Sequence, residues 1–270
     1  MGDLMRSKYN LPALVTCTLF TMTLFLACAD ENPNEPEGEI AAEETSTFDV
    51  TVVNHTRIVL EAVNGTTEIS GTPGATAIHI EAERRVTADN MDDAESYLDS
   101  VQVQVSDMTD SVFVKTIQPD DTGDKGCSVN YQITLPANFE VSIMNVNGIV
   151  EVESIENLVK VGNVNGNVVL GDISGNTFIT NVSGTITSEV TLQQDGTIDQ
   201  STVSGNIHLD IPQNTSAEIL ATATSGTVSI VNLDFEDEDT SPGYARGTLG
   251  GGQGTVTLQT TSGNIIITGF

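Results

Sequence analysis

The feature that most constrains the fold is a short phrase that recurs from about residue 143 to residue 230. It consists of a residue that is usually aliphatic, then Asn or Ser, then Gly, followed by β-branched residues. The step is nine residues, because Asn157 in Ile-Glu-Asn fills the slot between the first two glycines. A unit this short cannot bury an apolar face alone, so neighbouring units must stack. The glycines of the phrase are Gly148, Gly166, Gly175, Gly184, Gly205, Gly226 and Gly263, with an outlying copy at Gly65.

Side-chain polarity alternates through each phrase. Counted from the glycine, even offsets are apolar and odd offsets are mostly polar. This period of two predicts strands with one buried face. The pattern therefore predicts core positions at minus two, plus two and plus four, represented by Val146, Val164, Val182 and Val203 at minus two and by Val150, Val168, Ile186 and Ile207 at plus two.

Two architectures use short strands at this spacing. Asn-Gly between strands is a strong hairpin signal and predicts an antiparallel meander. A two-residue hairpin loop would put positions minus two and plus one on the same face, yet plus one is usually polar. The pattern favours an all-β, parallel β-solenoid whose coils of ~18–21 residues stack at about 4.8 Å. Residues carry no sign of its handedness.

The N-terminus has the form of a bacterial export signal. Arg6 and Lys8 precede an apolar run that ends in Leu-Ala-Cys28, which predicts a lipoprotein signal peptide over 1–27 with Cys28 as the lipidation site. The alternative is an uncleaved signal anchor, since the run approaches the length of a membrane span. Residues 28–47 are acidic and contain proline, which predicts a flexible tether. By analogy with lipoprotein sorting, Ala29 after the cysteine favours the outer membrane.

The remaining residues, 48–270, are predicted to form one domain. Residues 48–135 contain strands and a short helix over 87–98, with Thr87 or Asp89 as its N-cap. Residues 136–232 hold the regular repeat. Residues 233–254 are predicted to be a long loop, and residues 255–270 a terminal coil whose apolar end caps the stack.

These phrases, preceded by Tyr131-Gln-Ile-Thr-Leu-Pro-Ala-Asn-Phe-Glu-Val141, resemble the bacterial "putative adhesin" domain-of-unknown-function family. The resemblance runs from about Phe48 to Phe270 and includes Val63-Asn-Gly and Ile78-His-Ile-Glu-Ala in the first block. It implies an adhesin-like β-helical scaffold exposed in the cell envelope, with no established activity and no catalytic residues to carry over.

Composition excludes some partners. The formal net charge is −29, and no basic residue lies between Lys160 and Arg246, so nucleic acid and anionic surfaces are disfavoured. We expect no cofactor and no catalytic residue. Histidines lack zinc spacing, and Cys127 is interpreted as a small buried apolar residue. Weak candidates for calcium lie in an acidic run that is more simply a solvated loop: Asp234, Glu236, Asp237, Glu238 and Asp239.

The leading functional hypothesis is a non-enzymatic, lipid-anchored envelope protein that presents a polar surface to envelope proteins or glycans. One alternative is an accessory or sensor domain in envelope-stress signalling, and another is a β-helical carbohydrate-active enzyme, which needs a carboxylate pair across a groove. Candidate binding residues are the polar side chains at minus one: Asn147, Asn165, Ser174, Ser183, Ser204 and Ser225.

Overall fold

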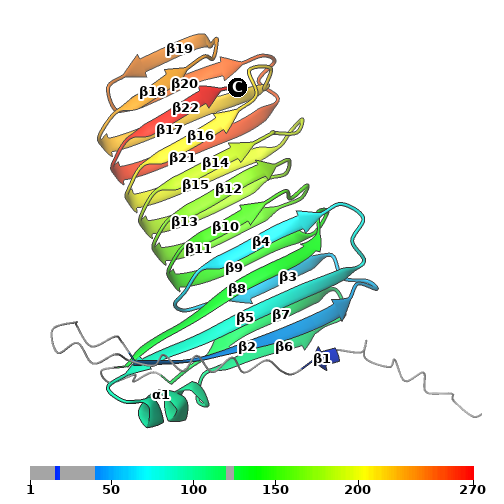
Figure 1. Cartoon of the computed structure of the whole chain (residues 1–270). Coiled ribbons are helices and arrows are strands. Elements are labelled where there is room, and N and C mark those ends of the chain that lie inside the picture. Colours follow the sequence, from blue (N-terminus) through cyan, green and yellow to red (C-terminus); the bar gives the residue numbers. More distant parts are fainter. Residues whose placement is uncertain (1–15, 19–39, 120–124) are drawn as a thin grey trace, which may run out of the picture.

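Two facing sheets of 11 strands each build the molecule. The computed structural model describes residues 16–18, 40–119 and 125–270. A tall stack of coils rises from a broader base that carries the single helix of the described residues (Figure 1). The expected fold class, a nearly all-β parallel solenoid with an N-terminal strand block and one short helix, is confirmed.

Each coil contributes one strand to each sheet. The coil step is 18 residues from 141 to 159 to 177, and 21 residues from 177 to 198, all in parallel register. In spatial order, sheet A contains β1 (Thr16–Thr18), β2 (Ile40–Thr51), β5 (Ala77–Ala88), β8 (Gly126–Pro136), β4 (Thr67–Thr72), β10 (Val150–Glu153), β12 (Val168–Ile173), β14 (Ile186–Val190), β16 (Ile207–Ile211), β22 (Ile265–Gly269) and β18 (Val228–Val231). Sheet B contains β19 (Glu236–Ser241), β20 (Tyr244–Leu249), β17 (Ala217–Ser225), β21 (Gly254–Ser262), β15 (Thr197–Ser204), β13 (Thr177–Ser183), β11 (Val159–Asn165), β9 (Glu140–Asn147), β3 (Arg57–Glu61), β7 (Ser111–Ile117) and β6 (Gln102–Asp107).

Glycines stack directly on one another at the corner that leads from sheet B to sheet A. Gly166 has φ +126°, and a Cβ added there would lie 2.0 Å from the carbonyl oxygen of Gly148. Both the backbone conformation and the close approach therefore require glycine. The same close approach repeats up the column, which comprises Gly65, Gly148, Gly166, Gly184, Gly205, Gly263 and Gly226.

The predicted facing of the residues before this corner is wrong. Val146, Val164, Val182 and Val203 point outward, with 40–49 % of their surface exposed. The buried positions in these strands are the odd ones, as at Asn145, while plus two is buried as predicted. Across the glycine corner the buried positions change from odd offsets before the glycine to even offsets after it. At the opposite corner they do not, and Ile155 and Ile173 are buried as expected.

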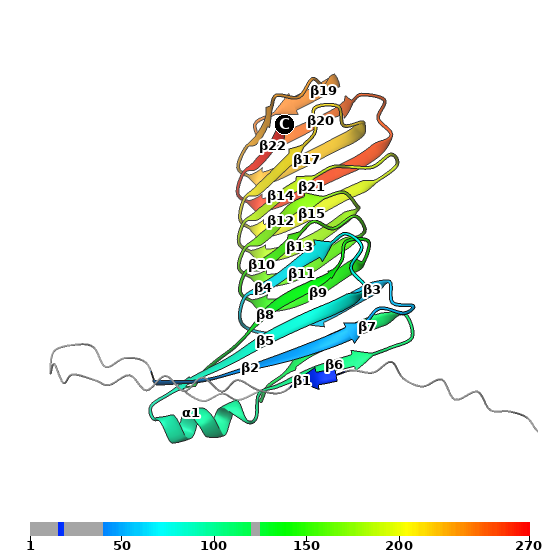
Figure 2. The same cartoon turned by 45° about the vertical axis from the view of Figure 1, so that its right-hand side comes forward.

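The N-terminal block mixes parallel and antiparallel pairs. The long strands β2, β5 and β8 pair antiparallel, whereas β3 and β4 form a coil that stacks on β9 and β10. The helix α1 (Met91–Leu98) packs on β2 and β5 at the base (Figure 2). Its N-cap is Asn90, whose side chain accepts from the Asp93 amide, and not Thr87 or Asp89. Residues 87 and 88 instead complete β5.

The C-terminal coil does not cap the stack. Strands β21 and β22 lie between the coil of β15 and β16 and the coil of β17 and β18, which precede them in the chain. The predicted loop over 233–254 instead forms the antiparallel hairpin of β19 and β20, which extends sheet B. Leu233 and Phe235 pack against the core beside it, and Phe235 lies against Gly247.

The N-terminal segments differ in part from expectation. Residues 40–47, placed in the predicted tether, belong to β2 and pair with β5. Thr16–Thr18, within the predicted signal peptide, pair antiparallel with residues 47–49. Cys28 and the rest of the predicted tether lie outside the described residues. Among the described residues, no helix is both long and apolar enough to cross a membrane.

Candidate functional surface at the glycine corner

The most extended exposed feature is a pair of parallel columns beside the stacked glycines, which we call the corner surface. The valine column consists of Val146, Val164, Val182 and Val203. The polar column is in register beside it and consists of Asn64, Asn147, Asn165, Ser183, Ser204, Ser262 and Ser225. Successive members of each column are one strand spacing apart, about 4.8 Å. The valine column spans the four coils of β9, β11, β13 and β15, and the polar column continues beyond it, beside Thr261 and Thr224 in the last two coils.

Asparagines in the polar column hydrogen-bond along the solenoid axis. Nδ2 of Asn147 donates to Oδ1 of Asn64 over 2.8 Å, and Nδ2 of Asn165 donates to Oδ1 of Asn147 over 2.9 Å. These bonds fix the side-chain amides in one orientation while their outer edges stay open to solvent. Each asparagine still offers unused donor and acceptor capacity to a ligand.

A buried amide column supports the corner from inside, and the sequence pattern did not reveal it. Nδ2 of Asn163 donates to Gly166 O over 3.1 Å, and Nδ2 of Asn145 donates to Asn163 Oδ1 over 3.0 Å. Nδ2 of Asn181 also donates to Gly166 O, over 3.0 Å. Further up, Thr202 and Thr260 donate to glycine carbonyls of the same column. Buried polar groups need such partners, so these residues hold the corner that displays the outer columns. Asn at minus three from glycine, repeated in three coils, was the available signal.

The structure brings together five of the six predicted binding residues. Asn147, Asn165, Ser183, Ser204 and Ser225 all belong to the polar column. Ser174 lies at the opposite corner, where its carbonyl accepts from Gln193 Nε2. Ser174 lies apart because each coil has two corners nine residues apart, and the nine-residue step does not distinguish one corner from the other.

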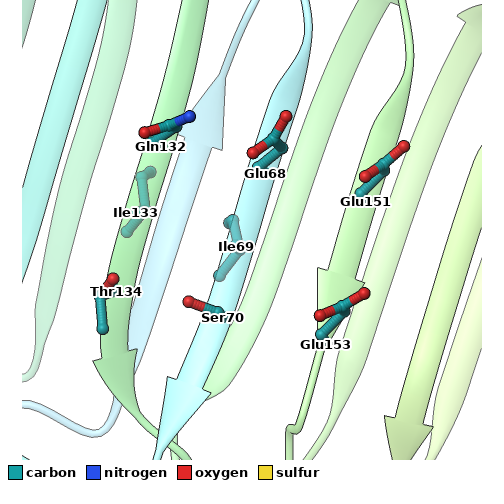
Figure 3. Close-up of a pocket in the computed structure, with 8 residues that line it drawn as sticks. All are labelled: Glu68, Ile69, Ser70, Gln132, Ile133, Thr134, Glu151 and Glu153. Atoms are coloured by element: carbon teal, nitrogen blue, oxygen red, sulfur yellow. The ribbon is translucent and has the colours of Figure 1, made fainter.

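A second feature is a shallow depression on the outer face of sheet A, where β8, β4 and β10 meet (Figure 3). It has a volume of about 410 Å³. Glu68 and Glu151 stand directly opposite each other in the parallel pair of β4 and β10, in one row with Gln132. Glu153 stands in the next row, beside Ser70. No ion pair joins these carboxylates to any described base.

The carboxylates of the depression can be compared with those of a glycosidase. Retaining enzymes place two carboxyl groups about 5–5.5 Å apart on either side of the scissile bond. Glu68 and Glu151 stand one strand spacing apart and project from the same open face of one sheet. No aromatic side chain lines the depression. The carboxylates can attract cationic groups.

The candidate metal ligands and Cys127 do not form a further site among the described residues. The described residues include no group of three or more His, Cys, Asp or Glu side chains arranged to hold a metal ion. The acidic run that supplied the weak calcium candidates lies mainly on β19, where every side chain is exposed. Cys127 is half-buried on β8, its thiol donates to Gln118 Oε1 over 3.5 Å, and burial raises its pKa. A raised pKa keeps the thiol protonated and unreactive at neutral pH.

The corner columns and the stacked glycines agree with a family assignment. The family model described as "Toastrack DUF4097" matches residues 41–268. The chain belongs to the toastrack DUF4097 family. This toastrack domain covers the N-terminal block as well as the solenoid, so the resemblance stated from the sequence is confirmed. Comparison with the curated proteins gives no match.

Three solved structures are similar to this toastrack chain at low identity. A "putative cell adhesion protein" from Clostridium sporogenes is 14 % identical, with a TM-score of 0.47, and covers 86 % of this chain and 100 % of its own. A "putative adhesin" from Bacteroides fragilis is 15 % identical, with a TM-score of 0.33, covering 83 % and 97 %. A "Putative lipid binding protein" from Parabacteroides distasonis is 10 % identical, with a TM-score of 0.29, covering 87 % and 98 %. At this level of similarity, the functional names belong to those proteins.

Proposed function

We propose that this toastrack protein is a non-enzymatic, lipid-anchored scaffold of the cell envelope that binds envelope proteins or glycans through its corner surface. The observation that carries the proposal is the pair of columns that run side by side over the coils of β9, β11, β13 and β15. Exposed valines recur in register beside exposed amides and hydroxyls. Regular repeats with extended surfaces are a common basis for binding long partners.

Charge restricts the partner. The chain has a formal net charge of −29, and Lys160 is the only base of the repeat between Glu140 and Phe235. Strongly anionic polymers would be repelled. Neutral glycans fit the corner surface, because their apolar ring faces can lie on valines and their hydroxyls can bond to Asn and Ser. An uncharged or cationic protein surface fits equally well.

The anchoring part of the proposal rests on the sequence. The export signal, Cys28 and the acidic residues after it would place the domain at a distance from a membrane, with the outer membrane favoured by Ala29. The decisive experiment compares membrane fractions of wild type and Cys28→Ala, with the mass of the mature N-terminus. A lipidated Cys28, and release of the variant from the membrane, are the expected results. An intact N-terminus in the inner membrane would sink the lipoprotein proposal and favour the signalling-accessory alternative.

A further inference from the structure

The two ends of the sheet stack are closed differently. At the N-terminal end, sheet A extends beyond sheet B, and α1 covers the excess by packing on β2 and β5. At the C-terminal end, sheet A stops at β18, while sheet B continues with β20 and β19. Leu233 and Phe235 are the apolar side chains of the crossing segment that pack against the core there. Sheet A therefore lacks strands opposite the hairpin (Figure 1).

Burial shows the same deficit. The inward residues Val228 and Ile230 of β18 are only partly buried, whereas their neighbours Ile265 and Ile267 on β22 are fully buried. Val231 on the outer face is 42 % exposed. An additional strand beside β18 would complete this burial.

The outer backbone edge of β18 is occupied by the hairpin turn at Val228, and its second outward position, Ile230, is left for pairing. Thr227 O accepts from the amide of Ile265 on β22, and the amide of Val228 points the other way and donates to Pro242 O over 2.8 Å. By strand alternation, the N–H and C=O of Ile230 also point away from β22. Natural edge strands are usually guarded by charges or proline. β18 has neither, while the other exposed edge at this end, β19, carries four acidic side chains in Glu236–Asp239.

We propose that β18 is a docking edge at which a cationic, extended segment of a partner protein adds as a further strand of sheet A. Charge complementarity selects this occupant, because the neighbouring segment carries Asp234 and the acids of β19, and Arg246 is the only base of the hairpin. A second copy of this chain would bring the same negative charge. This mode of recognition takes affinity from main-chain bonds and specificity from alternate side chains. It involves a site separate from the corner surface and does not depend on it.

The test uses the full chain and three fluorescently labelled, capped peptides. One alternates lysine with valine, one replaces the valines by prolines at the same charge, and one alternates glutamate with valine. Binding is measured by anisotropy. The lysine–valine peptide is expected to bind at least about tenfold more tightly than either control, because proline cannot pair as a strand and glutamate is repelled. Equal binding of the lysine–valine and lysine–proline peptides would mean nonspecific charge attraction and overturn the proposal.

Variants locate the binding edge. Ile230→Pro removes the outward amide without touching the bonds to β22 and is expected to weaken binding by about tenfold or more. Val231→Lys should weaken binding and Val231→Glu should strengthen it, and these two matched variants keep the test valid should Ile230→Pro fail to fold. Indifference of binding to the charge at residue 231 would overturn the proposal. So would self-association that Ile230→Pro abolishes in a chain that binds no peptide, since the occupant would then be a second copy.

Discussion

The N-terminal block and the solenoid solve the same packing problem by different chemistry. In residues 43–115, the strands are tied by ion pairs, including Arg84 with Glu44 at 2.7 Å and Lys115 with Glu61 at 2.7 Å. In the described solenoid from residue 140 onward, no ion pair is present. Its coils are held by stacked glycines and, in the lower coils, by hydrogen bonds between the side-chain amides of successive coils.

This difference teaches what an acidic repeat needs. A chain with few bases cannot pair its carboxylates coil by coil, and like charges opposite each other destabilise a sheet. The solenoid therefore uses uncharged Asn, Ser and Thr at its stacked corners, where Asn side chains bond to Asn of the next coil and Thr202 and Thr260 bond to glycine carbonyls. The bases are concentrated in the N-terminal block, where each strand has a different neighbour and individual pairs can form.

The largest effect is expected from removing the inserted coil of β21 and β22. Truncation after Gln253 deletes the fully buried Val256, Leu258, Ile265 and Ile267. At roughly 1.5–3 kcal/mol for each, the loss is about 6–12 kcal/mol, similar to the whole stability of a domain. We expect loss of cooperative unfolding in urea for the truncated solenoid. A matched deletion of residues 159–176, one whole 18-residue coil, preserves every column and should stay folded. Unchanged melting of the truncated chain would contradict the insertion of this coil.

The glycine column provides the next test. Gly166→Ala places a Cβ against Gly148 O at a positive φ and should lower the free energy of unfolding by about 2–4 kcal/mol. Gly162→Ala, in the preceding strand, meets nothing within 4 Å and should change stability by less than about 1 kcal/mol. Urea denaturation of both variants measures the contrast. Equal effects would mean that the column is not constrained.

The buried amides come third. Asn163→Ala leaves Gly166 O with one fewer donor and removes the closer acceptor of Asn145 Nδ2, which keeps only Gly148 O at 3.5 Å. The change should cost about 1–3 kcal/mol. Asn165→Ala removes an exposed amide of the polar column and should cost less than about 0.5 kcal/mol. Thermal or urea denaturation of the two variants compares the stability contributed by the buried amide with that contributed by the exposed one. The reverse order of effects would refute that division of roles.

The smallest expected effect concerns alkaline pH and the N-terminal block. Burial raises the pKa of Tyr131 to about 12, although Thr116 donates to or accepts from its hydroxyl at 2.7 Å. The folded state thus favours the neutral phenol. The free energy of unfolding is unaffected by this phenol below about pH 10. It falls by about 1.4 kcal/mol per pH unit as pH rises from 10 towards 12, because the unfolded state ionises first. Tyr131→Phe should remove this decline between pH 10 and 11, and a decline that persists in the variant would have another cause.

Sequence periodicity was sufficient for the fold but not for the facing of every residue. The nine-residue phrase predicts parallel stacking because glycine with flanking aliphatic residues recurs in coil after coil. It does not distinguish the two corners, so Val164 was assigned to the core and Ser174 to the polar column. The position of the C-terminal coil in the stack could not be predicted either, because the coils have similar sequences and the order in which they pair is seen only in the tertiary structure. The hairpin of β19 was hidden because acidic residues are poor strand formers.

The corner surface, which is the central claim, is tested most directly by binding of the labelled full chain to whole cells and to an array of neutral glycans. Val164→Lys with Val182→Lys places two charges in the valine column. Thr180→Lys with Thr187→Lys adds the same charges away from the valine column, on β13 of sheet B and β14 of sheet A. Loss of binding in the first variant, with binding retained in the second and both folded by circular dichroism, is the predicted result. Equal binding by the two variants would contradict a role for the corner surface.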